Sequence, residues 1–221
     1  MTNKTDITVI LDRSGSMYSI RADMEGAFNN FVEDQKKITT DEAILSLVEF
    51  NHSVNIRYQG LSLDKVPKLN LIPEGNTALF DAVGKTINNV GQRLSNLPEH
   101  QRPNKVVIVI ITDGAENSSR EFTHAQIKEQ IQHQTNVYKW VFVFLGANLN
   151  AVDVADSIGI HRVNSMTYAA NSVGTDSALR AFSENFGNYR SSGIATTLDF
   201  SVKQRGIQTQ AGVDAALNSV K

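Results

Sequence analysis

The chain has 221 residues and a formal net charge of −2, with 41% hydrophobic and 20% charged residues. These values are typical of a globular chain with one good-sized α/β domain, and they exclude wholesale disorder. The absence of cysteine excludes disulfides, thiolate zinc sites and cysteine nucleophiles. The absence of a long basic run argues against binding to a nucleic-acid backbone.

Strand and helix patterns alternate through the first part of the chain. The apolar run Ile7–Leu11 predicts a buried strand, and Ser19–Lys37 has the apolar stripe of an amphipathic helix. Ala43–Phe50 predicts a second buried strand. Val54–Tyr58 alternates between polar and apolar residues, so we expect it to form an edge strand paired with Ala43–Phe50.

The same alternation continues beyond the middle of the chain. Thr77–Leu97 has helical periodicity, and Lys105–Thr112 is a nearly unbroken Val and Ile run, which is typical of a strand covered on both faces. Phe122–His133 and Ala151–Ser157 predict shorter helices on either side of a fourth long strand, Val137–Leu145.

Strands that alternate with helices predict an α/β fold with a doubly wound, mostly parallel central sheet and helices on both faces. The strand Val54–Tyr58 would be its one antiparallel edge strand. In such sheets, ligands bind at the carboxyl ends of the strands. We therefore expect the functional loops to follow Leu11 and Thr112.

The pattern weakens after residue 163, so we divide the chain into a domain at 1–164 and a short C-terminal extension at 165–221. We expect the extension to be helical in part and packed on the same domain, because it is too short and too poor in apolar residues for a second core. Its last stretch, Arg205–Lys221, is rich in Gln, Gly, Ala and Ser and is expected to be loosely held.

Two patterns stand out within the extension. Asn171–Tyr189 predicts an amphipathic helix, and a short strand is expected where apolar residues alternate at Leu198, Phe200 and Val202. The residues that the helix is expected to bury are Val173, Leu179, Phe182 and Phe186.

Polar oxygens gather where the predicted strands end. The first strand runs into Asp12-Arg13-Ser14-Gly15-Ser16, the third long strand ends in Thr112-Asp113-Gly114, and Thr77 opens the second long helix. If the strand order is as inferred, one edge of the sheet brings together three hydroxyls and two carboxylates. These five candidate metal-binding residues are Asp12, Ser14, Ser16, Thr77 and Asp113.

An all-oxygen donor set without His or Cys suits a hard cation, with Mg²⁺ preferred over Mn²⁺ or Ca²⁺, and disfavours zinc. Where hydroxyls bind the ion directly and carboxylates bind through water, the ion stays strongly electrophilic. An open coordination position then favours an Asp or Glu side chain from another protein.

The motif D-x-S-x-S, a distant Thr and a later T-D-G resemble the metal-ion-dependent adhesion site of von Willebrand factor A (VWA) domains. The resemblance covers roughly residues 5–163, and its surroundings, ITVILDRSGSM, GNTALFDAV and VIIITDGAENSS, are similar to small prokaryotic or phage members. It implies direct metal bonds from the hydroxyls of Ser14, Ser16 and Thr77, and mainly water-mediated bonds from the carboxylates of Asp12 and Asp113. It also implies a Rossmann-like sheet and a role as a protein-binding module.

Simpler interpretations exist for each part of the motif. Asp12, Ser14 or Ser16 could cap the first helix, Thr77 could be the N-cap of the second long helix, and Asp113-Gly114 could be only a turn. The capping alternative explains one oxygen before the first helix, but not three at alternating positions. Glu116 could face the metal edge or be an exposed loop acid, while Asp81 is expected to support the site by hydrogen bonds and Arg13 to be exposed.

The alternative function is a metal-dependent phosphohydrolase with Asp12 as nucleophile. We prefer a non-enzymatic binding module, because Ser14 stands where an aspartyl-phosphate phosphatase would need a second Asp. A G-x-S-x-G elbow for a serine hydrolase is also absent.

The N-terminus is polar and leads into a short apolar run, and no apolar stretch approaches the length of a spanning helix. We therefore expect a soluble cytoplasmic protein with no membrane partner. The partner protein, the physiological metal and the oligomeric state stay open, with a monomer as the default.

Overall fold

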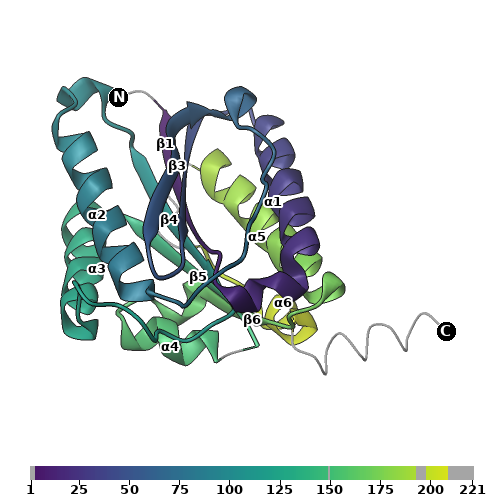
Figure 1. The fold of residues 1–221 in the computed structure, drawn as a ribbon. Helices are drawn as coiled ribbons and strands as arrows, with labels where there is room; N and C mark the ends of the chain where they lie inside the picture. The colour runs from purple at the N-terminus through teal and green to yellow at the C-terminus, as the bar shows by residue number, and fades with distance from the viewer. Residues whose placement is uncertain (1–2, 149, 193–197, 209–221) are drawn as a thin grey trace.

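The computed structural model describes residues 3–148, 150–192 and 198–208. Within these residues the chain builds one sheet in the order β3-β2-β1-β4-β5-β6, with all neighbouring strands parallel except β2 and β3 (Figure 1). The sequence therefore predicted the fold class correctly, including the antiparallel edge strand. The strands are β1 (Lys4–Asp12), β2 (Glu42–Phe50), β3 (Val54–Ser62), β4 (Lys105–Thr112), β5 (Val141–Ala147) and β6 (Ser165–Tyr168).

Helices cover both faces of the sheet. In Figure 1, α1 and α5 lie on one side of the strands, and α2 and α3 on the other. A 3-10 turn, η1 (Gly15–Ile20), precedes the first helix, and short 3-10 turns occur at Leu63–Lys65, Glu99–Gln101 and Arg162–Asn164. The helices are α1 (Arg21–Lys36), α2 (Leu79–Ser95), α3 (His124–Tyr138), α4 (Ala151–Ser157), α5 (Ser172–Ser191) and α6 (Val202–Gln208).

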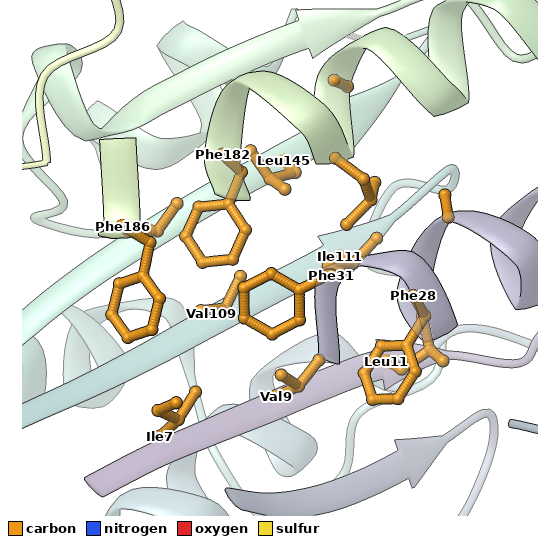
Figure 2. Packing of buried hydrophobic residues seen from close by; sticks show 14 of the residues in the cluster. Ile7, Val9, Leu11, Phe28, Phe31, Val109, Ile111, Leu145, Phe182 and Phe186 are labelled. Atoms are coloured by element: carbon orange, nitrogen blue, oxygen red, sulfur yellow. The ribbon is translucent and has the colours of Figure 1, made fainter. Parts of the chain in front are cut away.

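The core consists of two apolar layers because β1, β4 and β5 are buried on both faces. On the face of α1 and α5, Phe31 stacks on Phe182 with ring centroids 5.1 Å apart, and Phe186 lies 5.5 Å from Phe182. Figure 2 shows these rings above side chains such as Val9 and Val109 of the sheet. The unbroken Val and Ile runs in the sequence are therefore explained by contacts on both sides of each strand.

Buried charges fix the C-terminal end of α5 to the amino-terminal edge of the sheet. Arg190 donates to Oδ1 of Asp41 through Nε at 3.0 Å and Nη2 at 2.7 Å, and to the backbone oxygen of Gln35 at 2.7 Å. Lys105 donates to the carbonyl oxygens of Tyr189, Arg190 and Ser192 at 2.7 to 2.8 Å. These bonds satisfy carbonyl groups that a helix end leaves without intrahelical partners.

Residues beyond 164 contribute to this sheet and core. Strand β6 pairs with β5, and α5 packs against α1. The expected helix at Asn171–Tyr189 is confirmed as α5, but Val173 is 39% exposed rather than buried. The division of the chain at residue 164 stays a prediction.

Three other local predictions were wrong. Val137 and Tyr138 end α3 instead of starting a strand, because the chain turns at Lys139 with φ of +59° and β5 begins only at Val141. Phe200 is buried without belonging to a strand, and Val202 begins α6. Arg205, expected in a loose tail, lies in α6 and donates to the backbone oxygen of Val163 at 3.0 Å. Residues 209–221 lie outside the described residues.

The first turn of α5 offers a test of packing. A Cβ atom at Gly174 would lie 2.2 Å from the backbone oxygen of Ala169, so Gly174→Ala should lower the free energy of unfolding by roughly 1–3 kcal/mol. Gly26→Ala is the matched control, because Gly26 lies inside α1 with nothing within 4 Å of its Cβ position. The free energy of unfolding of this control variant should rise by about 0.5–1 kcal/mol. Urea denaturation measures both changes, and a neutral Gly174→Ala would contradict the close approach.

Candidate functional site

Three loops meet at the carboxyl edge of the sheet. The first follows β1, the second precedes α2, and the third follows β4. Backbone bonds join the first two: Gly15 donates to the oxygen of Gly75 at 3.0 Å, and Glu74 donates to the oxygen of Arg13 at 2.8 Å. In Figure 1 this edge is the lower one, where η1 and the start of α2 lie.

Asp12 ends β1 and is fully buried. Its Oδ1 accepts from the backbone N–H of Ser14 at 2.6 Å, and its Oδ2 accepts from the hydroxyl of Thr112 at 2.6 Å. Burial raises the pKa of Asp12 to about 6, although these hydrogen bonds act in the opposite direction. A buried carboxylate with this pKa is stabilised by a nearby cation.

The side chains of Ser14, Ser16 and Asp113 form a chain of polar contacts. The hydroxyl oxygens of Ser14 and Ser16 are 3.1 Å apart, and Ser16 donates to Oδ1 of Asp113 at 2.6 Å. Burial raises the pKa of Asp113 as well. Ser14 precedes η1 without a side-chain capping bond, so helix capping does not explain its hydroxyl.

Thr77 lies close to these side chains, and Gly114 is next to both Thr77 and Asp12. A Cβ atom at Gly114 would be 3.0 Å from Oγ1 of Thr77 and 3.8 Å from Oδ2 of Asp12. Asn117 holds the backbone of Thr77, accepting from its N–H at 2.9 Å and donating to its oxygen at 3.0 Å. The N-cap of α2 is Ala78, so Thr77 is not the capping residue.

The loop after β4 is attached to the start of α2 by two carboxylates. Glu116 accepts from the backbone N–H groups of Phe80, Ser118 and Ser119 and from the hydroxyl of Ser119, at 2.7 to 2.9 Å. Both of its oxygens thus accept hydrogen bonds from the loop or from α2. Neither alternative for this residue, a metal-facing acid or an exposed one, describes it.

Asp81 accepts from the backbone N–H groups of Arg120, Glu121 and Phe122, each at 2.9 Å. It therefore supports the site through the loop rather than by direct contact with the five candidate residues. The supporting roles of Glu116 and Asn117 had no local sequence signal beyond their position after T-D-G.

Arg13 occupies the first variable position of D-x-S-x-S and was expected to be exposed. Its side chain is only 15% exposed, because Nη1 donates to Oε1 of Glu74 at 2.7 Å. The guanidinium thus adds a side-chain link between the first two loops.

The donor set is rich in hydroxyls and holds only two carboxylates. Among the described residues, no group of three or more His, Cys, Asp or Glu side chains is placed to hold a metal. The five candidates instead combine carboxylate and hydroxyl oxygens at one edge, which fits a hard divalent cation with several water ligands. These residues fit such an ion, with Asp12 and Asp113 supplying the negative charge.

Fold and site together define a Rossmann-like α/β domain with an oxygen-rich edge. The von Willebrand factor type A domain model matches residues 6–152, and the chain belongs to that family. Members of the family commonly mediate protein–protein interactions. A comparison with curated protein sequences finds no match.

Solved structures agree with the fold. Proximal thread matrix protein 1 from the mussel byssus, described with a zinc-occupied MIDAS motif, is 17% identical at a TM-score of 0.58, covering 83% of this chain and 46% of that one. The vWF domain of the pilus tip protein Mfa5 from Porphyromonas gingivalis is 10% identical at a TM-score of 0.63, with coverages of 88% and 99%. A von Willebrand factor type A protein from Catenulispora acidiphila is 16% identical at 0.55, with coverages of 93% and 43%. The chain therefore spans less than half of the mussel and Catenulispora proteins.

In the described part of the chain, no helix is both long and apolar enough to cross a membrane.

Proposed function

We propose that this domain binds one divalent cation through Asp12, Ser14, Ser16, Thr77 and Asp113, and uses the ion to capture an acidic side chain of a partner protein. The observation that carries the proposal is the convergence of these residues from three loops, with Ser16 bonded to Asp113 and Gly114 seated between Thr77 and Asp12. The zinc-occupied motif of the mussel protein supports a divalent ion at such an edge.

Mg²⁺ is the ion that we propose, with Mn²⁺ and Ca²⁺ as alternatives, because oxygen donors suit hard cations. The ion would lie beside the buried carboxylate of Asp12 and the half-buried carboxylate of Asp113, and two carboxylates alone do not close its coordination shell. An Asp or Glu from outside then completes the shell. The domain itself positions the hydroxyls, holds the carboxylates and leaves the edge open to the partner.

Binding is favoured over catalysis because the carboxylates are held by structural bonds. Asp12, the nucleophile that a phosphohydrolase would use, accepts from both Ser14 and Thr112. Ser14 also stands where a phosphatase would need its second Asp. A cytoplasmic location, a prokaryotic or phage origin and a monomeric state stay predictions.

The test is calorimetric titration of the chelator-treated protein with Mg²⁺, Mn²⁺, Ca²⁺ and Zn²⁺, beside Thr77→Ala. The parent should bind one ion, and Thr77→Ala should bind at least tenfold more weakly with an unchanged far-UV spectrum, because one direct ligand is lost. Thr123→Ala is the control: Thr123 caps α3 and is not part of the proposed site. Equal binding by Thr77→Ala and the parent would contradict the proposed ligand set.

Partner capture is tested separately by pull-down with and without chelator. Proteins retained only with metal, and lost with Thr77→Ala, support the binding function. Their release by free acetate or glutamate would show that a carboxylate completes the metal shell. Retention that is insensitive to both chelator and mutation would contradict the mechanism.

A further inference from the structure

Tyr168 ends β6 and is fully buried, yet its hydroxyl has no hydrogen-bond partner within the described part of the chain. Buried hydroxyl groups in native proteins nearly always have a partner, so such a group calls for an explanation. Tyr168 lies at the same carboxyl edge of the sheet as the candidate metal site.

The strand register places Tyr168 in line with Asp113. Strand β4 pairs Thr112 with Gly146 of β5, and β5 pairs Ala147 with Tyr168. Asp113 directly follows Thr112, so Asp113, Ala147 and Tyr168 continue one row across three strands. Adjacent strands lie about 4.8 Å apart, so the outer two members are separated by about 10 Å.

The middle residue of this row is small. Ala147 and Tyr168 both belong to the apolar layer on the α1 and α5 face, together with Ile111. Asp113 lies one residue past the end of β4, beside the carboxyl ends of β5 and β6. Ala147 carries only a methyl group, so no bulky side chain of β5 stands in this row between Tyr168 and Asp113.

Electrostatics agrees with this placement. Burial raises the pKa of the Tyr168 phenol most, and the negative charges of Asp113 and then Asp12 raise it further. The hydroxyl therefore stays protonated and is available as a hydrogen-bond donor. The Oδ1 atom of Asp113 already accepts from Ser16, which leaves Oδ2 for a second donor.

We propose that Tyr168 is a positioning residue of the metal centre, whose hydroxyl donates through one water to Oδ2 of Asp113 and so orients that carboxylate towards the ion. This inference rests on the proposed metal site. It assigns β6, which lies outside the residues matched by the family model, a part in metal binding. Residues that orient a metal ligand in this way commonly change metal affinity by 10- to 100-fold.

Tyr168→Phe removes only the hydroxyl and keeps the ring in the core. We expect it to weaken Mg²⁺ and Mn²⁺ binding by about tenfold or more in calorimetric titration. The melting temperature of the metal-free protein should change no more than it does in the control variant. Tyr58→Phe is a matched control. The Tyr58 hydroxyl is also buried and has no partner among the residues that the structure describes, but it lies on β3, beside Glu49 and Arg57.

A spectroscopic measurement separates positioning from simple packing. Addition of metal should change the near-UV tyrosine absorbance of the parent and of Tyr58→Phe, and this change should be lost in Tyr168→Phe. Equal affinity and an equal spectral change in Tyr168→Phe would overturn the inference while leaving the metal site intact. An equal loss of affinity in both variants would overturn it too. A folded parent that binds no metal would instead refute the proposed function itself.

Discussion

Replacing Asp12 by Asn is expected to abolish metal binding and, in metal-free protein at pH 7.5, to raise the free energy of unfolding. Asn keeps the shape of the side chain and an oxygen that can accept from the backbone N–H of Ser14. It removes a negative charge that is fully buried. The charge of Asp12 is thus expected to lower the stability of the metal-free protein while being required for metal binding, as is common for functional sites.

The magnitude follows from the pKa of Asp12, which burial raises from 3.8 to about 6. The folded state therefore binds the proton more tightly than the unfolded state does. The associated stability is fully present below pH 3.8 and is lost as the pH rises through about 6. At roughly 1.4 kcal/mol for each pKa unit, the cost of the ionised group at neutral pH is about 2–3 kcal/mol.

Urea denaturation of both proteins between pH 4 and pH 8 without metal tests this expectation. The difference in stability between Asp12→Asn and the parent should grow between pH 4 and pH 7 and then level off. Saturating metal should reverse its sign, because only the parent gains stability by mass action. Asp64→Asn is the control at an exposed carboxylate. A parent that is more stable than Asp12→Asn in chelator at pH 7.5 would show that burial does not dominate at this residue.

Replacing Arg190 by Met should lower the free energy of unfolding by about 3–5 kcal/mol, because Asp41 would be left as an unpaired buried charge. The side chains of Arg190 and Asp41 are 1% and 0% exposed, and their oxygen and nitrogen are 2.7 Å apart. Met has a similar length and can fill the space against Gln35, so the expected loss is mainly electrostatic.

The double variant Asp41→Asn/Arg190→Met separates the charge from the packing. Removing both charges should recover much of the loss, since a buried pair can often be replaced at little net cost. The exposed pair Arg180 and Asp176 gives the control: Arg180→Met should cost less than about 1 kcal/mol. Urea denaturation of the parent and of the three variants gives the free energies of unfolding to be compared. A loss below about 1 kcal/mol for Arg190→Met would mean that α5 is not anchored as the structure shows.

Metal affinity should be nearly unchanged in Arg190→Met under conditions where the protein is folded. Arg190 contacts the segment before β2, at the amino ends of the strands, whereas the candidate site lies at their carboxyl ends. A parallel loss of metal affinity would reveal coupling between the two edges through α5.

Much of this protein was predictable from local sequence because burial on both faces leaves a strong local pattern. Strand β4 matches its Val and Ile run residue for residue, and β3 was correctly predicted as the antiparallel edge. The candidate site was also visible, because Asp12 and Asp113 directly follow or end strands whose carboxyl ends must meet at one edge.

Other features depended on contacts that no local pattern reports. Strand β6 has only four residues, too few for a clear alternation, and it forms because β5 offers an open edge. Val137 and Tyr138 have strand-type side chains, yet they complete α3 because the chain turns at Lys139 before β5 begins.

The α/β class, the strand that ends in Asp12 and the order of the oxygen donors follow from periodicity and residue type, so the residues alone predict them. How the donors are supported depends on the folded chain. Glu116 accepts from the backbone N–H of Phe80, which is 36 residues away in the chain, and Asn117 accepts from that of Thr77, 40 residues away. Such contacts join residues far apart in the chain, so packing of the complete fold selects them, and the residues beside them in sequence do not.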